Sequence, residues 1–142
     1  MEVGYIFAIG AAMVWGLVYA IDQQILAGMT PVMFLFIGSV VSAVIMLPFV
    51  LLGNDSLKSL FVLGRTSLLL ILASIVLATL ADFFILSGIK HMDASTASII
   101  EIAYPFFVVL FSYFFFKSSP NIYFFIGGLL IFAGSAIIIK FA

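Results

Sequence analysis

Three acidic residues lie within long apolar stretches of this sequence: Asp22, Asp82 and Glu101. Ionisable side chains inside such stretches are costly to bury, and they are functional candidates by default. A buried carboxylate can exchange a proton near neutral pH or pair with a cationic solute. The alternative is an ion pair with Lys90 or Lys140 at the membrane surface. We favour this alternative for Asp22, and both interpretations stay open for Asp82 and Glu101.

Aromatic and polar side chains share one face of two predicted helices. They are Trp15, Tyr19 and Asp22 near the start of the sequence, and Ser98, Glu101 and Tyr104 further along. Both sets follow the three- and four-residue spacing that brings side chains to one helix face. Aromatic walls with a few polar groups suit small organic solutes. We predict that Trp15, Tyr19, Ser98 and Tyr104 line a substrate path. Packing or interface anchoring are the alternatives for the aromatic residues.

Pro105 lies well inside the fourth apolar run. It has no backbone N–H, so it leaves the carbonyl of Glu101 without its helical partner. Proline is tolerated in membrane helices, and a kink is expected here. The kink is either a hinge or a fixed bend.

Five apolar runs must position these residues. They cover about residues 3–26, 31–52, 66–87, 94–116 and 121–139. A bilayer core about 30 Å thick needs roughly 20 apolar residues per helix, so each run is close to spanning length. The runs are continuously apolar and do not alternate with period two, which favours helices over barrel strands. We predict an all-α membrane protein in which residues 1–142 form a single domain of five transmembrane helices.

Composition excludes several other classes. Hydrophobic residues make up 66% of the chain and charged residues 8%, whereas soluble domains carry about 25% charge. The net charge of −1 gives no case for a nucleic-acid partner, and the absence of cysteine excludes disulfides and cysteine-based metal sites. We expect no cofactor, no metal and no enzyme activity, because no nucleophile–base arrangement is visible. Met1-Glu2 lacks a basic leader region, so the first run is expected to be a retained span.

Small residues recur at helix-packing spacing, most clearly at Gly38, Gly127 and Gly134. Such residues let helix backbones approach closely. We expect them to pack helices within the chain, and contacts between two copies are the alternative.

Basic residues give only a weak orientation signal. Lys58, Arg65 and Lys117 fall on the N-terminal side of the predicted topology, against Lys90 and Lys140 on the other. Basic residues beside span ends favour the cytoplasm. Three basic residues on one side against two on the other do not fix the orientation, so two possibilities stay open. The chain inserts in one orientation, or it inserts both ways and two copies meet antiparallel.

Several sequence segments resemble EamA-type domains of the drug/metabolite transporter superfamily. They are Ala8–Gly16, Asp93–Ser98, Tyr104-Pro105 and Ile126–Gly134, and their order covers almost the whole chain. The chain departs from the family pattern after the fourth run, where Lys117-Ser118 stands in place of a common Gly-Glu. The related four-helix multidrug branch has a glutamate midway in its first helix, and this chain has Trp15 near that depth.

The resemblance implies a transporter of small organic solutes such as amino acids, often an exporter, in the plasma or inner membrane. Typical family members contain two such domains of opposite topology. An odd number of spans places the two ends of the sequence on opposite sides of the membrane, and five helices form a small bundle. We therefore expect an antiparallel homodimer, in contact with membrane lipid, built as an inverted repeat. The alternative is a membrane subunit or scaffold that functions only with a paralogous half.

Overall fold

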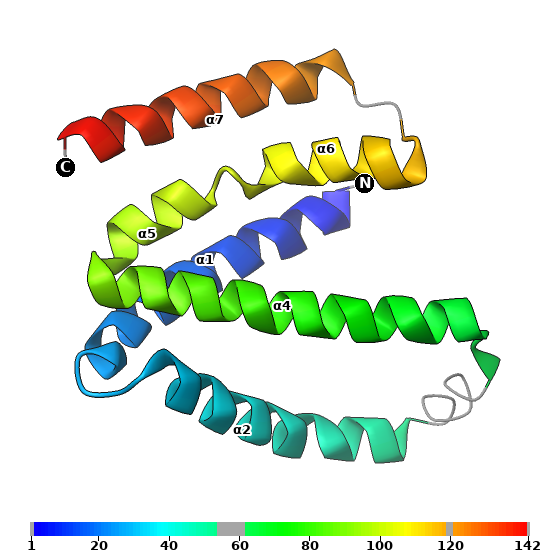
Figure 1. Cartoon of the computed structure of the whole chain (residues 1–142). Helices are drawn as coiled ribbons and strands as arrows, with labels where there is room; N and C mark the ends of the chain where they lie inside the picture. The colour runs from blue at the N-terminus through cyan, green and yellow to red at the C-terminus, as the bar shows by residue number, and fades with distance from the viewer. Residues whose placement is uncertain (1, 54–61, 119–120, 142) are drawn as a thin grey trace. The chain divides into compact units, whose positions relative to one another are not determined.

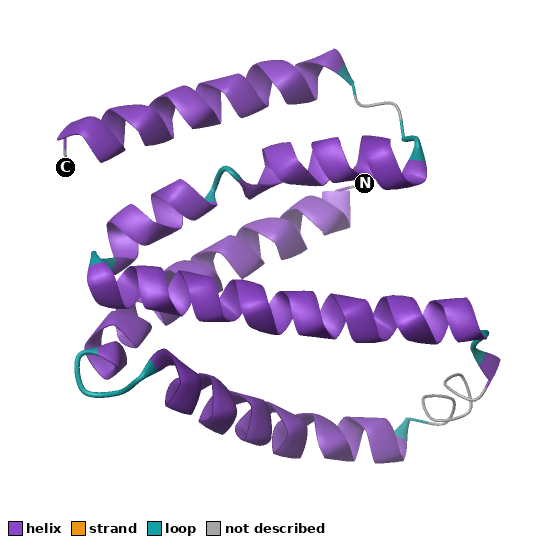
Figure 2. Ribbon diagram, viewed as in Figure 1, coloured by secondary structure: helices purple, strands orange, loops and turns teal. Residues whose placement is uncertain are grey.

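The computed structural model describes residues 2–53, 62–118 and 121–141. Six helices occupy this part of the chain: α1 (Glu2–Leu26), α2 (Pro31–Leu52), α4 (Arg65–His91), α5 (Ala94–Glu101), α6 (Tyr104–Phe116) and α7 (Ile122–Phe141) (Figure 1). Figure 2 shows that the described residues contain helices and loops and no strand. Lys58, which enters the charge comparison above, lies outside the described residues.

Five segments are long and apolar enough to cross a membrane. They are Val3–Leu26, Pro31–Leu52, Arg65–His91, Ala94–Phe116 and Ile122–Phe141. The fourth combines α5 and α6. The prediction of an all-α membrane protein with five spans is confirmed, and the protein is a multi-pass membrane protein.

The chain forms two compact units. One unit contains α1 up to Ile25 together with the last turn of α4, α5, α6 and α7. The other unit contains α2 and the rest of α4, up to Ser87. Nearly all the candidate side chains belong to the first unit, and Asp82 belongs to the second.

In the second unit, sequence signals set the ends of α2. The hydroxyl of Thr30 accepts a hydrogen bond from the N–H of Met33 at 3.3 Å, and Pro31 occupies the first turn. Both features are typical of helix starts. Helix α2 ends at Gly53, whose N–H donates to the carbonyl of Phe49.

Helix α4 is longer than predicted. The sequence placed its end near residue 87, with a loop beginning at Gly88, but the helix continues to His91. Lys90 and His91 occupy its last turn, where positive charge is favourable beside the negative end of the helix dipole. Gly88 faces α5, and a Cβ at this position would lie at an ordinary contact distance of 3.8 Å from the Cβ of Ala97.

The fourth span is interrupted rather than gently kinked. Helix α5 ends at Glu101 and α6 starts at Tyr104. Between them, the N–H of Ala103 donates to the carbonyl of Ile100 at 3.3 Å, which is the tighter 3₁₀ spacing. Pro105 lies in the first turn of α6. It supplies no N–H to the carbonyl of Glu101, so the regular helix ends before the proline.

Candidate functional site

A hydrogen bond joins α1 to α5 inside the membrane-spanning part of the first unit. The hydroxyl of Tyr19 donates to the carboxylate of Glu101, with 2.7 Å between the oxygens, and both side chains are half-buried. Tyr19 is seven residues before the end of α1 at Leu26, and Glu101 is seven residues after the start of α5 at Ala94. At about 1.5 Å per residue, each lies roughly 10 Å inside its span. Two residues that the sequence nominated separately therefore form one polar pair.

Trp15 extends this pair along α1. Its ring centroid lies 5.5 Å from that of Tyr19, with the two planes tilted by 50°. Trp15 is 53% exposed and belongs to an open apolar surface of α1 that also includes Phe7, Val14 and Val18. Trp15 lies eleven residues before Leu26, which is roughly 16 Å and close to the centre of a bilayer core about 30 Å thick. Trp15 thus extends the Tyr19–Glu101 pair with an exposed aromatic ring on α1.

The N-terminus of α5 is held by a second contact from α1. The side-chain carbonyl of Gln23 accepts the N–H of Ala94 at 2.8 Å. Tyr19 and Gln23 are four residues apart, so one face of α1 reaches both ends of α5. This contact satisfies one of the N–H groups that lack a partner in the first turn of any helix.

Asp93 caps α5 from its own chain. Its carboxylate accepts hydrogen bonds from the N–H of Thr96 at 2.8 Å and from the hydroxyl of Thr96 at 2.7 Å. These bonds stabilise the charged form and lower the pKa of the Asp93 carboxyl below its ordinary value. Asp93 lies between spans, and its cap fixes where α5 begins.

Ser135 of α7 supports the helix break. Its hydroxyl lies 2.9 Å from the carbonyl of Ile99 and 3.0 Å from the carbonyl of Ile131. The carbonyl of Ile99 lacks its usual partner, because the N–H of Ala103 bonds to Ile100 instead. Ser135 is buried, so this contact satisfies a polar group that water would otherwise have to reach. Helix α5 is therefore tied to α1 and to α7.

The remaining predicted residues are placed differently. Asp22 is buried, with 5% of its surface exposed. The hydroxyl of Ser98 donates to the carbonyl of Ser95 within α5. Tyr104 starts α6 just beyond the break and is 60% exposed. Asp82 is exposed and lies nine residues before the end of α4, roughly 13 Å inside that helix. The structure brings Trp15, Tyr19 and Glu101 together, and the roles of all these residues remain predictions.

The three glycines predicted to pack helices have open space beside them. A Cβ built at Gly38, Gly127 or Gly134 meets no described atom within 4 Å. The close approaches lie instead at Gly88 and at Gly128, where a Cβ would be 3.8 Å from the ring of Phe106. Close packing within the described chain is thus not seen at the three predicted positions.

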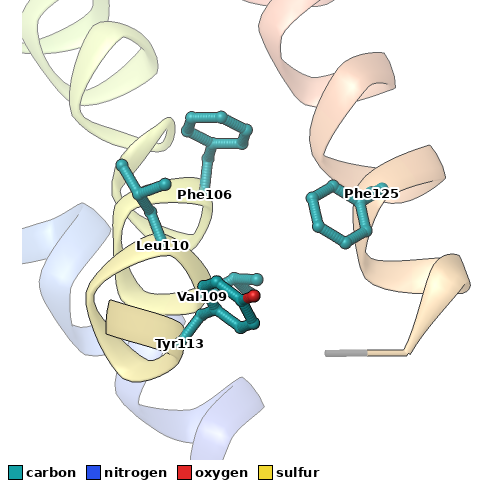
Figure 3. Close-up of a pocket in the computed structure, with 5 residues that line it drawn as sticks. All are labelled: Phe106, Val109, Leu110, Tyr113 and Phe125. Carbon is teal, nitrogen blue, oxygen red and sulfur yellow. The ribbon is translucent and has the colours of Figure 1, made fainter. Parts of the chain in front are cut away.

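Two cavities lie between α6 and α7. One of about 300 Å³ is lined by Phe106, Val109, Leu110 and Tyr113 of α6 and by Phe125 of α7 (Figure 3). The other, of about 350 Å³, shares Phe106 and includes Pro105, Gly127 and Gly128. No charged residue lines either cavity. They offer apolar surface beside the break but no carboxylate such as that of Glu101.

Sequence reasoning missed Gln23 and Ser135. Both are ordinary polar residues, and their significance lies in the backbone groups they contact. The available signal was their position inside apolar spans. In the described part of the chain, no three His, Asp or Glu side chains gather to form a possible metal site.

The comparison with protein-family models identifies the family of the chain. The model of the EamA-like transporter family matches residues 2–140. No curated protein and no solved structure matches the chain. Because the family match covers nearly all of its length, the chain belongs to the EamA-like transporter family of the drug/metabolite transporter superfamily.

Proposed function

We propose that the protein is a secondary transporter that exports small organic metabolites, such as amino acids, by alternating access. Membership of a transporter family supports the general activity. The observation that carries the proposal is the hydrogen bond between Tyr19 and Glu101, which places a carboxylate inside a span. Such intramembrane carboxylates mark substrate or proton pathways.

The interrupted fourth span supports transport as well. Substrate and ion sites in secondary transporters are typically built at discontinuous helices near the bilayer midplane. Glu101 is the last residue of α5, directly before the break. Helix α5 can move relative to α6 by small changes at Ile102 and Ala103, and Pro105 makes a continuous helix unfavourable there. We assign Pro105 to the hinge of alternating access.

The functional unit in this proposal is an antiparallel pair of copies in the plasma or inner membrane. The near balance of basic residues around the spans supports insertion in both orientations. Two inverted copies would enclose a pathway in the way that inverted repeats do within one chain. The open space beside Gly127 and Gly134 leaves a face where helices of a second copy can approach. The protein in this view acts as a transporter and not as an enzyme.

Uptake by liposomes tests the proposal. Purified protein in liposomes should show saturable uptake of at least one solute from a panel of amino acids, nucleobases, amines and drugs. Absence of flux across the whole panel would contradict it. Co-purification distinguishes this proposal from the alternative of a subunit that needs a paralogous half. A stable homodimer supports the proposal. An obligate second polypeptide would identify the chain as a subunit of a mixed complex.

A further inference from the structure

We propose that the transported solute carries an organic ammonium group, which binds the Glu101 carboxylate in place of the Tyr19 hydroxyl and packs against the ring of Trp15. This inference rests on the proposed transport function and adds the chemical class of the substrate. It follows from charge, from backbone polarity at the helix break, and from the aromatic groups beside the carboxylate.

The charges inside the described spans are acidic. Asp22, Asp82 and Glu101 lie more than one helical turn from a span end, whereas the basic residues occupy the ends. Arg65 begins α4, Lys90 lies in its last turn, Lys117 follows α6 and Lys140 lies in the last turn of α7. An anionic solute at the depth of Glu101 would meet a like charge. A cationic solute would find the opposite charge that a carboxylate in low dielectric requires.

The backbone at Glu101 has the same polarity as its side chain. Glu101 ends α5, and the last carbonyls of a helix carry partial negative charge. Pro105 cannot donate to the carbonyl of Glu101, so this oxygen keeps its acceptor capacity. The hydroxyl of Ser135 already occupies the carbonyl of Ile99 one half-turn earlier. Carboxylate and carbonyl together therefore favour a donor with positive charge.

Tyr19 and Trp15 complete a site for a cation. The Tyr19 hydroxyl is an uncharged donor to the Glu101 carboxylate, and an ammonium in its place would bring the opposite charge as well as a hydrogen bond. The Trp15 ring lies beside Tyr19, and Trp15 is half exposed on an open apolar surface of α1. Tryptophan is the best aromatic partner for ammonium groups. Asp22 is a poor competitor for the solute, because it is 5% exposed.

Trp15 also makes the inference measurable, because it is the only tryptophan in the chain. The emission of purified, full-length protein can be titrated with two matched pairs of probes. Choline is compared with its uncharged isostere neohexyl alcohol, and hexylammonium is compared with hexanol. We expect the charged member of at least one pair to shift the emission at a concentration about tenfold below its neutral partner.

Substitutions identify the carboxylate. Glu101→Gln should remove the preference for the charged probe, whereas Glu101→Asp should retain part of it, which controls for misfolding. Glu2→Gln, at the chain's other glutamate, should behave like the unmodified protein. Equal or absent responses to charged and neutral probes, or an unchanged preference in Glu101→Gln, would overturn the ammonium class. Solute flux in the liposome panel would in that case leave the transporter standing, so the two failures are distinguishable.

Discussion

At the scale of single residues, the Tyr19 hydroxyl gives Glu101 a hydrogen-bond donor within a span. The hydrocarbon core supplies no water to replace it, so the pair stabilises the position of α5 as well as the charge of Glu101. Asp93 plays a different part, because it lies between spans and accepts two bonds from Thr96. One acid belongs to the candidate site, and the other fixes the start of the helix that carries it.

Tyr19→Phe should destabilise the protein by about 0.6–1.7 kcal/mol, the range measured for hydrogen bonds between membrane helices. The ring of Tyr19 stays, so its contact with Trp15 is kept and the loss reports the hydroxyl alone. Tyr5→Phe removes a hydroxyl from the same helix at an exposed position and serves as the control. Unfolding in mixed detergent measures both variants. Equal stability of the two would contradict a structural role for the Tyr19 bond.

Asp93 should make part of the stability dependent on pH. Its carboxyl pKa is lower in the folded protein than in the unfolded chain, because the bonds from Thr96 favour the charged form. Its contribution is therefore complete above the unfolded pKa and is lost as the pH falls through the lower, folded pKa. In Asp93→Asn the cap remains but no longer titrates. Melting temperatures between neutral pH and about pH 3 should show the unmodified protein losing stability relative to this variant. Parallel curves would contradict the assignment.

At the scale of helices, the main feature is a span divided into α5 and α6. Helix α5 is held by Gln23 at its start, and by Tyr19 and Ser135 near its end. These three contacts come from α1 and α7. The break thus has defined partners on the α5 side.

Ser135→Ala should cost about 0.6–1.7 kcal/mol, because the carbonyl of Ile99 then loses its partner at the break. Ser42→Ala, at an exposed position on α2, is the matched control and should change little. Detergent unfolding of both variants provides the comparison. A loss confined to Ser42→Ala, or none in either, would show that the break needs no support from α7.

Lys117→Gly should stabilise the protein by roughly 1 kcal/mol. Lys117 follows α6 with φ at 52°, a left-handed conformation that glycine adopts without a steric penalty. Lys117→Ala removes the charge but keeps the Cβ, so it separates the two effects and should bring no such gain. Thermal unfolding in detergent measures the difference, and equal behaviour of the two variants would rule out backbone strain as the cause.

The sequence predicted the five spans better than the contacts between them. Hydropathy and span length located these helices, because a lipid environment imposes both. The partners of Gln23 and Ser135 could not be predicted, since both contact backbone groups far away in the chain. Helix α4 extends beyond its predicted end near residue 87, to His91.

At the scale of the whole molecule, one EamA-like domain spans residues 2–140. The antiparallel homodimer is our proposal for how this domain encloses a pathway, and it makes a topological prediction. The chain contains no cysteine, so single cysteines introduced at Ser118 and Met92 can be labelled selectively. Ser118 follows α6 and Met92 follows α4. In a five-span topology these two positions lie on opposite sides of the membrane.

An impermeant thiol reagent should label about half of each cysteine in intact cells if the chain inserts both ways. Permeabilised cells give the total label for each position. Labelling of Met92→Cys alone, or of Ser118→Cys alone, would establish a single orientation and contradict the antiparallel pair.

Solute exchange across liposomes tests the central claim, that Glu101 serves the transport pathway. Once a solute has been found in the uptake panel, its exchange is measured with purified protein of the original sequence, with Glu101→Gln and with Glu2→Gln. We predict that Glu101→Gln lowers the initial rate by about tenfold or more, since a charge-assisted contact is lost, whereas Glu2→Gln leaves the rate unchanged. Exchange by Glu101→Gln at the unmodified rate would contradict the claim.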